Sequence, residues 1–326
     1  MLRTQYQVRG PVPQDVIEVV EFETPTPAEG EVLLEMLAAP INPSDVLTLT
    51  GHYGILPPLP AFAGNEGVGK VVTHGAGVSS PAIGQTVLLP LGCGTWSTHI
   101  TANANSLVAL PNDADPQQLA MIAINPPTAS LILSEFVDLQ PGEWVIQNAA
   151  NSAVGYYLIQ LAKKRGLKTV NIVRRASLIE PLKAAGADVV LVDDDNLVKE
   201  IAEATDHARI RLGVDAVGGI ATAKLGDALS PEATLVNYGM MSGKPCSLSA
   251  AVLIFKDITV RGFWLAKWFE AASQEEKSKL YGNLTRLIVT GELKAPVHAT
   301  YKVKDVKEAV VAAVMGERDG KILLTN

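Results

Sequence analysis

The feature that most constrains the fold is a change of pattern near residue 123. After this point, short runs rich in β-branched residues alternate with amphipathic helical runs, which is the rhythm of βαβ units around a parallel sheet. The clearest helical run, Val154–Lys164, is stopped by Gly166. The expected strands are Trp144–Gln147, Thr169–Val173, Val189–Val192, Gly213–Val217, Thr234–Tyr238 and Ile258–Gly262. The sequence therefore predicts an α/β fold with a doubly wound parallel sheet.

The residues before this point have a different texture. Short β-runs with frequent turn signals, such as Val32–Leu37, Gly67–Val72 and Gln85–Leu89, are typical of an antiparallel, barrel-like domain. The late strand-like segments Thr300–Val303 and Lys321–Leu324 do not continue the βαβ rhythm. Because 326 residues exceed one compact core of ordinary size, we expect two domains. The mostly β domain takes residues 1–122 and 267–326, and the doubly wound domain takes 123–266.

Composition excludes several classes of function. The formal net charge of −7 gives no support to nucleic-acid binding, and no apolar run is long enough to span a membrane. The first ten residues have neither the apolar stretch of a secretory signal nor the long Arg/Ser-rich amphipathic stretch of an organelle transit peptide, so a cytoplasmic location is expected. The chain has only two cysteines, Cys93 and Cys246, which supply neither a disulfide framework nor a four-cysteine zinc lobe. We expect both to be reduced and buried.

A candidate cofactor site follows the first strand of the doubly wound domain. In such sheets the pyrophosphate of a dinucleotide lies at the turn between the first strand and the next helix. Aligned to G-x-G-x-x-G, the turn Asn148–Gly155 holds Ala150, Ser152 and Gly155, so only the last glycine is kept. Small side chains still let the backbone approach a phosphate. On the motif alone, an ordinary strand-to-helix turn is an equally good interpretation.

A pair of arginines points to the form of the cofactor. Arg174 and Arg175 follow the second strand, where an NAD site carries an acidic residue for the ribose diol. Two guanidinium groups suit a 2′-phosphate and offer nothing to a diol. The pair therefore indicates NADPH rather than NADH, and a solvated basic loop is the alternative.

Several segments together resemble a known family. They are Asn42-Pro43-Ser44-Asp45, Gly51-His52-Tyr53-Gly54, Gly64-Asn65-Glu66-Gly67-Val68-Gly69, Asn125-Pro126, Gln147–Gly155 and Gly262-Phe263-Trp264. Their order and spacing are similar to those of the mitochondrial-type 2-enoyl thioester reductases of the medium-chain dehydrogenase/reductase superfamily, over essentially the whole chain. The resemblance implies a GroES-like catalytic domain beside a Rossmann domain.

The resemblance also bears on metal binding. Zinc alcohol dehydrogenases of this superfamily carry a cysteine near position 42 and a histidine at position 65, and both positions hold asparagine here. Asparagine is a poor zinc ligand, and none of the five histidines has a partner at ligand spacing. Without a Lewis acid, a conjugated thioester or a quinone is a more suitable hydride acceptor than a simple ketone. We therefore expect no metal site.

Individual roles follow from the same resemblance. Tyr53 matches the proton donor. Asn42 and backbone N–H groups near Asn65 are candidates for holding an oxyanion. The cofactor contacts implied are Asn125, Asn151, Ser152, Ala153, Val154, Arg174, Arg175, Tyr238, Gly239, Met240, Met241, Phe263, Trp264, Leu265 and Lys321. Ala153 and Met240 stand where the family usually has glycine.

The implied function is NADPH-dependent reduction of the C=C bond of a trans-2-enoyl thioester, with hydride to Cβ and a proton to Cα. The thiol carrier, coenzyme A or acyl carrier protein, stays open. An NADPH:quinone oxidoreductase of the same superfamily is the alternative. A non-catalytic NADPH-binding protein that contacts RNA or a partner is a third interpretation, disfavoured by the acidic charge. For Tyr53, the alternative to a proton donor is a packing role. The resemblance also implies a homodimer paired through the sixth strand.

Overall fold

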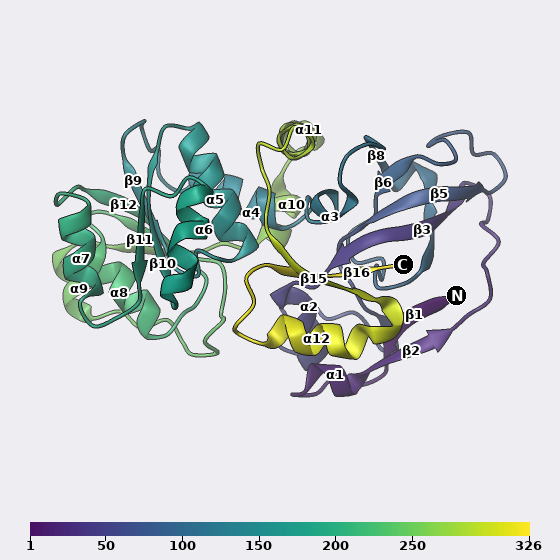
Figure 1. Cartoon of the computed structure of the whole chain (residues 1–326), viewed down its shortest axis with the longest axis horizontal. Coiled ribbons are helices and arrows are strands. Elements are labelled where there is room, and N and C mark those ends of the chain that lie inside the picture. The colour runs from purple at the N-terminus through teal and green to yellow at the C-terminus, as the bar shows by residue number, and fades with distance from the viewer. The chain divides into compact units, whose positions relative to one another are not determined.

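A computed structural model describes all 326 residues, and these form two compact units. Unit 1 comprises residues 1–124, 281–291 and 295–326, and unit 2 comprises residues 125–280 and 292–294. Figure 1 labels most elements of both units, which are described separately below.

The core of unit 2 is a six-stranded parallel sheet with the order β11-β10-β9-β12-β13-β14. This order confirms the doubly wound sheet that the sequence predicts. The strands are β9 (Trp144–Gln147), β10 (Lys168–Val173), β11 (Val189–Val192), β12 (Ile210–Asp215), β13 (Thr234–Asn237) and β14 (Thr259–Gly262). The first strand, β9, lies between β10 and β12, so the chain reverses its direction of progress across the sheet there.

Helices cover both faces of this sheet (Figure 1). α4 packs against α5 on one face, and α7 packs against α8 on the other. The helices of unit 2 are α4 (Asn125–Glu135), α5 (Ala153–Lys164), α6 (Ile179–Ala184), α7 (Leu197–Ala204), α8 (Ile220–Ala228), α9 (Ala250–Phe255) and α10 (Leu265–Ala271), with the 3-10 turn η2 (Ala176–Leu178). All βα turns therefore open at the carboxyl edge of the sheet, where parallel sheets of this type bind ligands.

Strand β12 begins earlier than the sequence indicates. We expected Gly213 at its start, yet Gly213 lies in mid-strand beside Leu235. A Cβ on Gly213 would lie 2.8 Å from the Cδ1 atom of Leu235, so this glycine makes room for core side chains. Glycine thus marks close packing here rather than a strand boundary.

Unit 1 is mostly β, as its turn-rich sequence predicts. Strand β3 is its centre and pairs antiparallel with β5, β7 and β16. The strands are β1 (Leu2–Tyr6), β2 (Ile17–Glu21), β3 (Glu31–Pro40), β4 (Ala61–Phe62), β5 (Val68–His74), β6 (Thr86–Leu88), β7 (His99–Asn103), β8 (Val108–Leu110), β15 (Val297–Lys302) and β16 (Lys321–Thr325). The late strands β15 and β16 therefore extend the sheet that the amino-terminal residues begin.

Short helices close the core of unit 1, where α12 packs against α1 and β16. They are α1 (Pro13–Val16), α2 (Pro43–Thr50), α3 (Pro116–Leu119) and α12 (Val306–Val314), with the 3-10 turns η1 (Ala104–Ser106) and η3 (Val303–Asp305); α11 (Gln274–Val289) includes residues of both units. Tyr6, Trp96, Leu34 and Val306 are fully buried among these elements. No helix of the structure combines the length and apolar character needed to cross a bilayer.

Candidate functional site

The turn after β9 has the geometry of a phosphate-binding turn. Ser152 is the N-cap of α5, and its Oγ accepts a hydrogen bond from the backbone N–H of Gly155 at 3.1 Å. Asn151 is half-buried before it, while Ala153 and Val154 are buried in the first turn of the helix. A Cβ on Gly155 would lie 2.3 Å from the carbonyl oxygen of Ala150, so only glycine fits there. The predicted turn residues therefore lie together at the positive end of α5.

A buried carboxylate lies beside this turn, where the chain changes direction across the sheet. Asp215 ends β12, and its Oδ1 accepts hydrogen bonds from Asn148 Nδ2 at 2.7 Å and from the N–H of Gly218 at 3.0 Å. Its Oδ2 accepts from Thr222 Oγ1 at 2.6 Å and from Asn237 Nδ2 at 3.1 Å. Asp215 thus fixes the ends of three neighbouring strands, β9, β12 and β13.

The environment of Asp215 keeps it ionised. Burial by itself raises the pKa of a carboxyl group, but the hydrogen bonds from Thr222 and Asn148 and from two backbone N–H groups outweigh it. The pKa of Asp215 therefore lies below its usual range. This residue serves as a fixed negative support rather than as a proton donor.

The segment after β13 completes the carboxyl edge. Ser152 forms a side-chain hydrogen bond to Tyr238, and burial of the phenol raises the pKa of Tyr238. A Cβ on Gly239 would lie 2.5 Å from the carbonyl oxygen of Ala216, so this glycine lets two βα turns approach closely. Met240 and Met241 follow it and are about half exposed, at 53% and 52%.

The remaining predicted residues of unit 2 follow the strands β10 and β14 or begin the helix α4. Arg174 follows β10 and is exposed, and Arg175 beside it is half-buried. Phe263 follows β14 and packs edge-on against Phe136, with ring centroids 6.0 Å apart. Trp264 and Leu265, at the start of α10, are half-buried. Asn125, which begins α4, is only 6% exposed.

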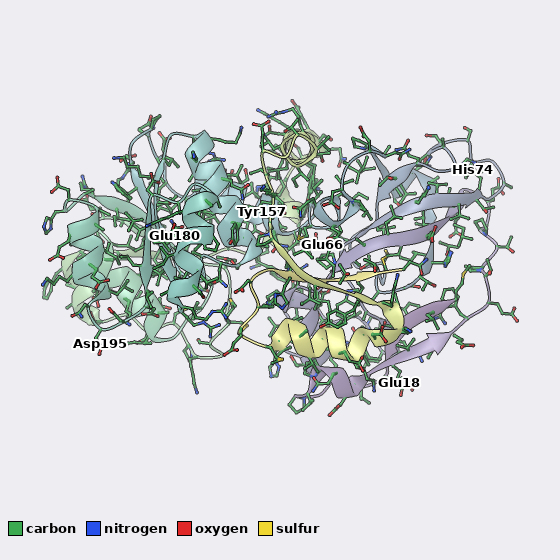
Figure 2. The ribbon with its side chains drawn as sticks, in the orientation of Figure 1. Glu18, Glu66, His74, Tyr157, Glu180 and Asp195 are labelled. Atoms are coloured by element: carbon green, nitrogen blue, oxygen red, sulfur yellow. The ribbon has the colours of Figure 1, made fainter.

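Unit 1 contains a buried polar cluster that the sequence did not reveal. Asn42, Asp45, Glu66 and Lys321 are each 5% exposed or less, and Figure 2 shows Glu66 within this unit. Asn42 Nδ2 donates to Glu66 Oε1 at 2.6 Å, and Lys321 Nζ donates to Asn42 Oδ1. Glu66 Oε2 accepts from the backbone N–H groups of Ala123 at 3.1 Å and Ile124 at 3.0 Å. The cluster joins the start of α2 to β16 and to the chain ahead of α4.

Burial dominates the titration of this cluster. Loss of water raises the pKa of Asp45 to about 6 and that of Glu66 to about 7, and it lowers the pKa of Lys321 to about 8. In each case the desolvation of the charged form outweighs the attraction between Lys321 and the carboxylates. Asp45 also accepts from the Asn42 N–H at 2.7 Å and from Asn65, which lower its pKa in part.

Tyr53 lies in the turn after α2. Its backbone N–H donates to the carbonyl oxygen of Leu47 at 3.1 Å, and its side chain is half-buried. Gly51 ends α2 with a φ of +80°, a left-handed conformation that favours glycine. The cap residue Asn42 and the turn residue Tyr53 therefore lie at opposite ends of one short helix.

The donor set of unit 1 does not fit a catalytic zinc ion. Asn42 Oδ1 accepts from the Lys321 ammonium, and a buried cation at this position opposes the binding of a second cation. No group of three or more His, Cys, Asp or Glu side chains comes together as a metal site. The expectation that both cysteines are buried is wrong for Cys246, which is exposed in the loop after β13, whereas Cys93 is half-buried.

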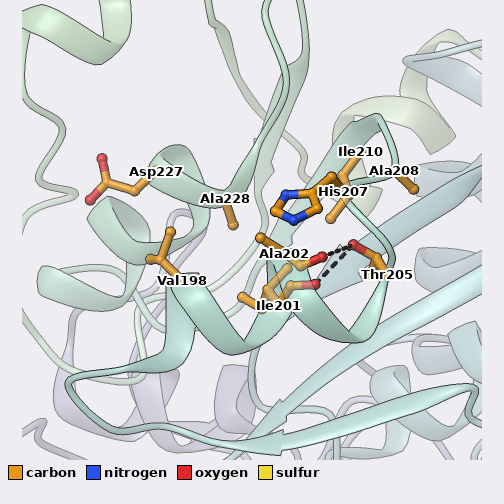
Figure 3. A pocket seen from close by; sticks show the side chains of 9 residues that line it. All are labelled: Val198, Ile201, Ala202, Thr205, His207, Ala208, Ile210, Asp227 and Ala228. Carbon is orange, nitrogen blue, oxygen red and sulfur yellow. Dashed lines mark hydrogen bonds between the residues drawn. The ribbon is translucent and has the colours of Figure 1, made fainter.

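A hollow of about 150 Å³ lies elsewhere in unit 2 (Figure 3). Its lining comes from α7, from Ile210 at the amino end of β12, and from the end of α8 near Asp227. The opposite end of β12 carries Asp215, so this hollow lies away from the carboxyl edge. It brings none of the predicted site residues together.

Sequence reasoning assigned no role to Asp45, Glu66 or Asp215. Asp215 carried a usable signal, because it is a single charge inside the apolar run Gly213–Val217. Buried carboxylates are almost always paired or hydrogen-bonded, so such a charge predicts a buried network. Nothing in the sequence indicates which side chains complete that network, because its members are far apart along the chain.

Two family models match the chain. The alcohol dehydrogenase GroES-like domain matches residues 28–112, and the zinc-binding dehydrogenase model matches residues 153–280. Both confirm the predicted combination of a GroES-like and a Rossmann domain. Positions 42 and 65, where zinc relatives hold ligands, lie within the first match, and both are asparagine.

Among curated proteins, the chain is 40% identical to the mitochondrial enoyl-acyl-carrier-protein reductase of Rattus norvegicus over 93% of this chain and 83% of that protein. The relatives from Homo sapiens and Arabidopsis thaliana are also named mitochondrial. These names contradict the expected cytoplasmic location. That expectation rested only on the pattern of the first ten residues.

Solved structures agree in fold. A complex of Etr1p, a 2-enoyl thioester reductase of Candida tropicalis, with NADP and crotonyl-CoA has a TM-score of 0.87 at 28% identity, covering 100% of this chain and 99% of that one. The quinone oxidoreductase of Escherichia coli complexed with NADPH has a TM-score of 0.87 at 27% identity, and both chains are covered fully. The identity and coverage of the curated relatives show that the chain belongs to the mitochondrial-type enoyl-acyl-carrier-protein reductase family of the medium-chain dehydrogenase/reductase superfamily.

Proposed function

We propose that this protein reduces the C=C bond of a trans-2-enoyl thioester with NADPH, placing hydride on Cβ and a proton on Cα. The observation that carries the proposal is the state of Asn42, whose amide is held between Glu66 and the Lys321 ammonium. An asparagine whose amide is held in this way does not ligate a metal, so no Lewis-acid site for a simple ketone forms at this position. A conjugated thioester accepts hydride without one, and Etr1p is solved with crotonyl-CoA.

NADPH fits the carboxyl edge of the unit 2 sheet. The turn of Asn151, Ser152, Ala153 and Val154 offers backbone N–H groups and the end of α5 to the pyrophosphate. Arg174 and Arg175 suit the 2′-phosphate. The segments Tyr238–Met241 and Phe263–Leu265, with Asn125, are the residues proposed for the nicotinamide end. Lys321 is less suited to a cofactor contact, because its ammonium is bonded to Ile41 O and Asn42 inside unit 1.

When bound, NADPH supplies the hydride that reaches Cβ. Tyr53 then gives its phenolic proton to Cα of the resulting enolate. A phenol is a far stronger acid than the α-carbon of a thioester, so the transfer to the enolate is downhill. Asn42 acts as a positioning residue for the start of α2, because both polar atoms of its amide are engaged and the side chain is only 2% exposed.

The test is a comparison of acceptors under steady-state conditions. NADPH oxidation is followed with crotonyl-CoA, crotonyl-acyl-carrier protein and a naphthoquinone, with NADH in parallel. The proposal expects both thioesters to exceed the quinone in kcat/KM, and their ratio identifies the preferred carrier. A quinone that exceeds both thioesters would establish the quinone oxidoreductase instead, in line with the Escherichia coli structure.

A homodimer paired through β14 is part of this proposal. β14 is the edge strand of its sheet, and all four of its residues are exposed. Phe255 and Ile254, in α9 just before it, are 82% and 69% exposed, so the edge carries apolar surface. Light scattering of the purified protein is expected to give the mass of a dimer, and Val260→Lys is expected to shift it toward the monomer.

A further inference from the structure

The feature that carries this inference is an acidic residue beside the arginine pair. β10 and β11 are parallel neighbours in which Val173 pairs with Val192. The next residues are Arg174 and Asp193, and the N–H of Asp193 donates to the carbonyl oxygen of Val173 at 2.8 Å. Arg174 and Asp193 therefore leave the sheet side by side. An acidic group at this place opposes the binding of a 2′-phosphate.

A lysine from a distant helix covers this carboxylate. Lys224 lies on α8, and its Nζ contacts Asp193 Oδ1 at 2.5 Å and donates to the carbonyl oxygen of Asp194 at 2.8 Å. The side chains of Lys224 and Asp193 are 25% and 29% exposed, so this ion pair is partly enclosed. The ammonium is thus held by two acceptors on the loop that follows β11.

We propose that Lys224 is a specificity-determining residue that neutralises Asp193, so that the edge formed by Arg174 and Arg175 stays positive enough to accept the 2′-phosphate of NADPH. This inference rests on the proposed NADPH site. It assigns a role in cofactor specificity to Lys224, which lies on α8, away in sequence from the phosphate turn after β9 and from the arginine pair after β10. Asp194 and Asp195 are exposed, so solvent screens their charges more strongly than that of Asp193.

The expected effect is electrostatic and moderate. An unpaired carboxylate beside a doubly charged phosphate, partly screened by water and salt, weakens binding about three- to tenfold. NADH lacks the 2′-phosphate, so its affinity is expected to change little. Because the Debye length is about 8 Å at physiological ionic strength and shorter at high salt, the loss is expected to shrink as salt is added.

The test measures equilibrium binding of NADPH and NADH to the full chain by fluorescence titration. Lys224→Met is expected to raise the Kd for NADPH about three- to tenfold at low salt and to leave that for NADH within twofold. Lys224→Met combined with Asp193→Asn is expected to recover most of the NADPH affinity, since no carboxylate is left to neutralise. Lys168→Met is the matched control, because Lys168 begins β10 at the opposite edge of the sheet, about 20 Å from Arg174.

Three outcomes would overturn the inference. They are an equal loss for NADPH and NADH, unchanged binding of both, and failure of the double variant to recover. An equal loss would assign Lys224 a structural role, which urea unfolding of the same variants measures directly. The arginine variants separate this inference from the NADPH site itself. If Arg174→Ala with Arg175→Ala leaves NADPH binding unchanged, the site is wrong; if it weakens NADPH and Lys224→Met does not, only this inference fails.

Discussion

Asn42 donates a hydrogen bond from Nδ2 to Oε1 of Glu66 at 2.6 Å, inside a region where both side chains are almost fully buried. On its other side the amide oxygen accepts from the Lys321 ammonium. Each polar atom of the amide therefore faces a charge of the favourable sign. A reversed amide would place its oxygen against the carboxylate and its N–H groups against the ammonium, so the orientation of Asn42 is fixed.

The first prediction concerns metal content. The purified protein is expected to contain substoichiometric zinc and to keep its activity after treatment with a chelator, because Asn42 and Asn65 replace thiolate and imidazole ligands. Elemental analysis of the protein before and after chelation is the measurement. A stoichiometric zinc ion that is lost together with activity would contradict this prediction. It would favour zinc-dependent dehydrogenase chemistry, as in the name of the family model that matches residues 153–280.

The second prediction concerns the pH dependence of stability. Burial raises the pKa of Asp45 from about 3.8 in the unfolded chain to about 6. The stability that this group contributes is therefore fully present below pH 3.8 and is lost as the pH rises through 6. Relative to Asp45→Asn, the unfolding free energy of the wild type is expected to fall by about 3 kcal/mol at most across this window.

Urea unfolding of the two proteins at several pH values measures that difference. Asp113→Asn, at an exposed position of the same unit, serves as the control and is expected to show no comparable slope. A difference that instead grows as the pH rises would mean that Lys321 and the N–H donors hold the carboxylate in its charged form more strongly than burial opposes it.

The third prediction concerns Tyr53. Tyr53→Phe keeps the ring and removes the hydroxyl, so folding and NADPH binding are expected to change little. Loss of the proton donor is expected to lower kcat roughly 10²- to 10⁴-fold. If water enters and protonates the enolate, the rate loss is smaller and the configuration at Cα changes.

The measurements are kcat and the Cα configuration of product formed in deuterium oxide. Tyr301→Phe, a hydroxyl deletion on β15 of the same unit, is the control. An unchanged rate with an unchanged configuration for Tyr53→Phe would identify Tyr53 as a packing residue. The quinone reaction, which needs no proton on carbon, would then be the better assignment.

The fourth prediction concerns the arginine pair. Arg174→Ala with Arg175→Ala is expected to weaken NADPH at least tenfold, because charge-assisted hydrogen bonds contribute roughly 1.5–3 kcal/mol each. NADH is the internal control, since it offers no 2′-phosphate to these side chains. The Kd values of the two nucleotides decide the matter. An unchanged Kd for NADPH would show that the pair is a solvated loop.

The sequence by itself determined the elements and their layering. The doubly wound sheet followed from the alternation of β-branched and amphipathic runs. The first kind of run forms strands and the second forms helices, and each helix buries its apolar face against the sheet. The sequence also marked Gly155 as the one glycine of the G-x-G-x-x-G pattern that this turn keeps, and a Cβ there would lie 2.3 Å from the carbonyl oxygen of Ala150. Both features depend on residues that are close together in the sequence, so the sequence alone predicts them.

Only the tertiary structure decided the polar networks. Asn42, Glu66 and Lys321 are up to 279 residues apart, yet their side chains share hydrogen bonds because β16 joins the sheet that β3 begins. Likewise, Lys224 reaches Asp193 across 31 residues because α8 packs beside α7. Sequence patterns show that a charge is buried or exposed, but its partner is set by how distant elements pack, and no local rule encodes that pairing.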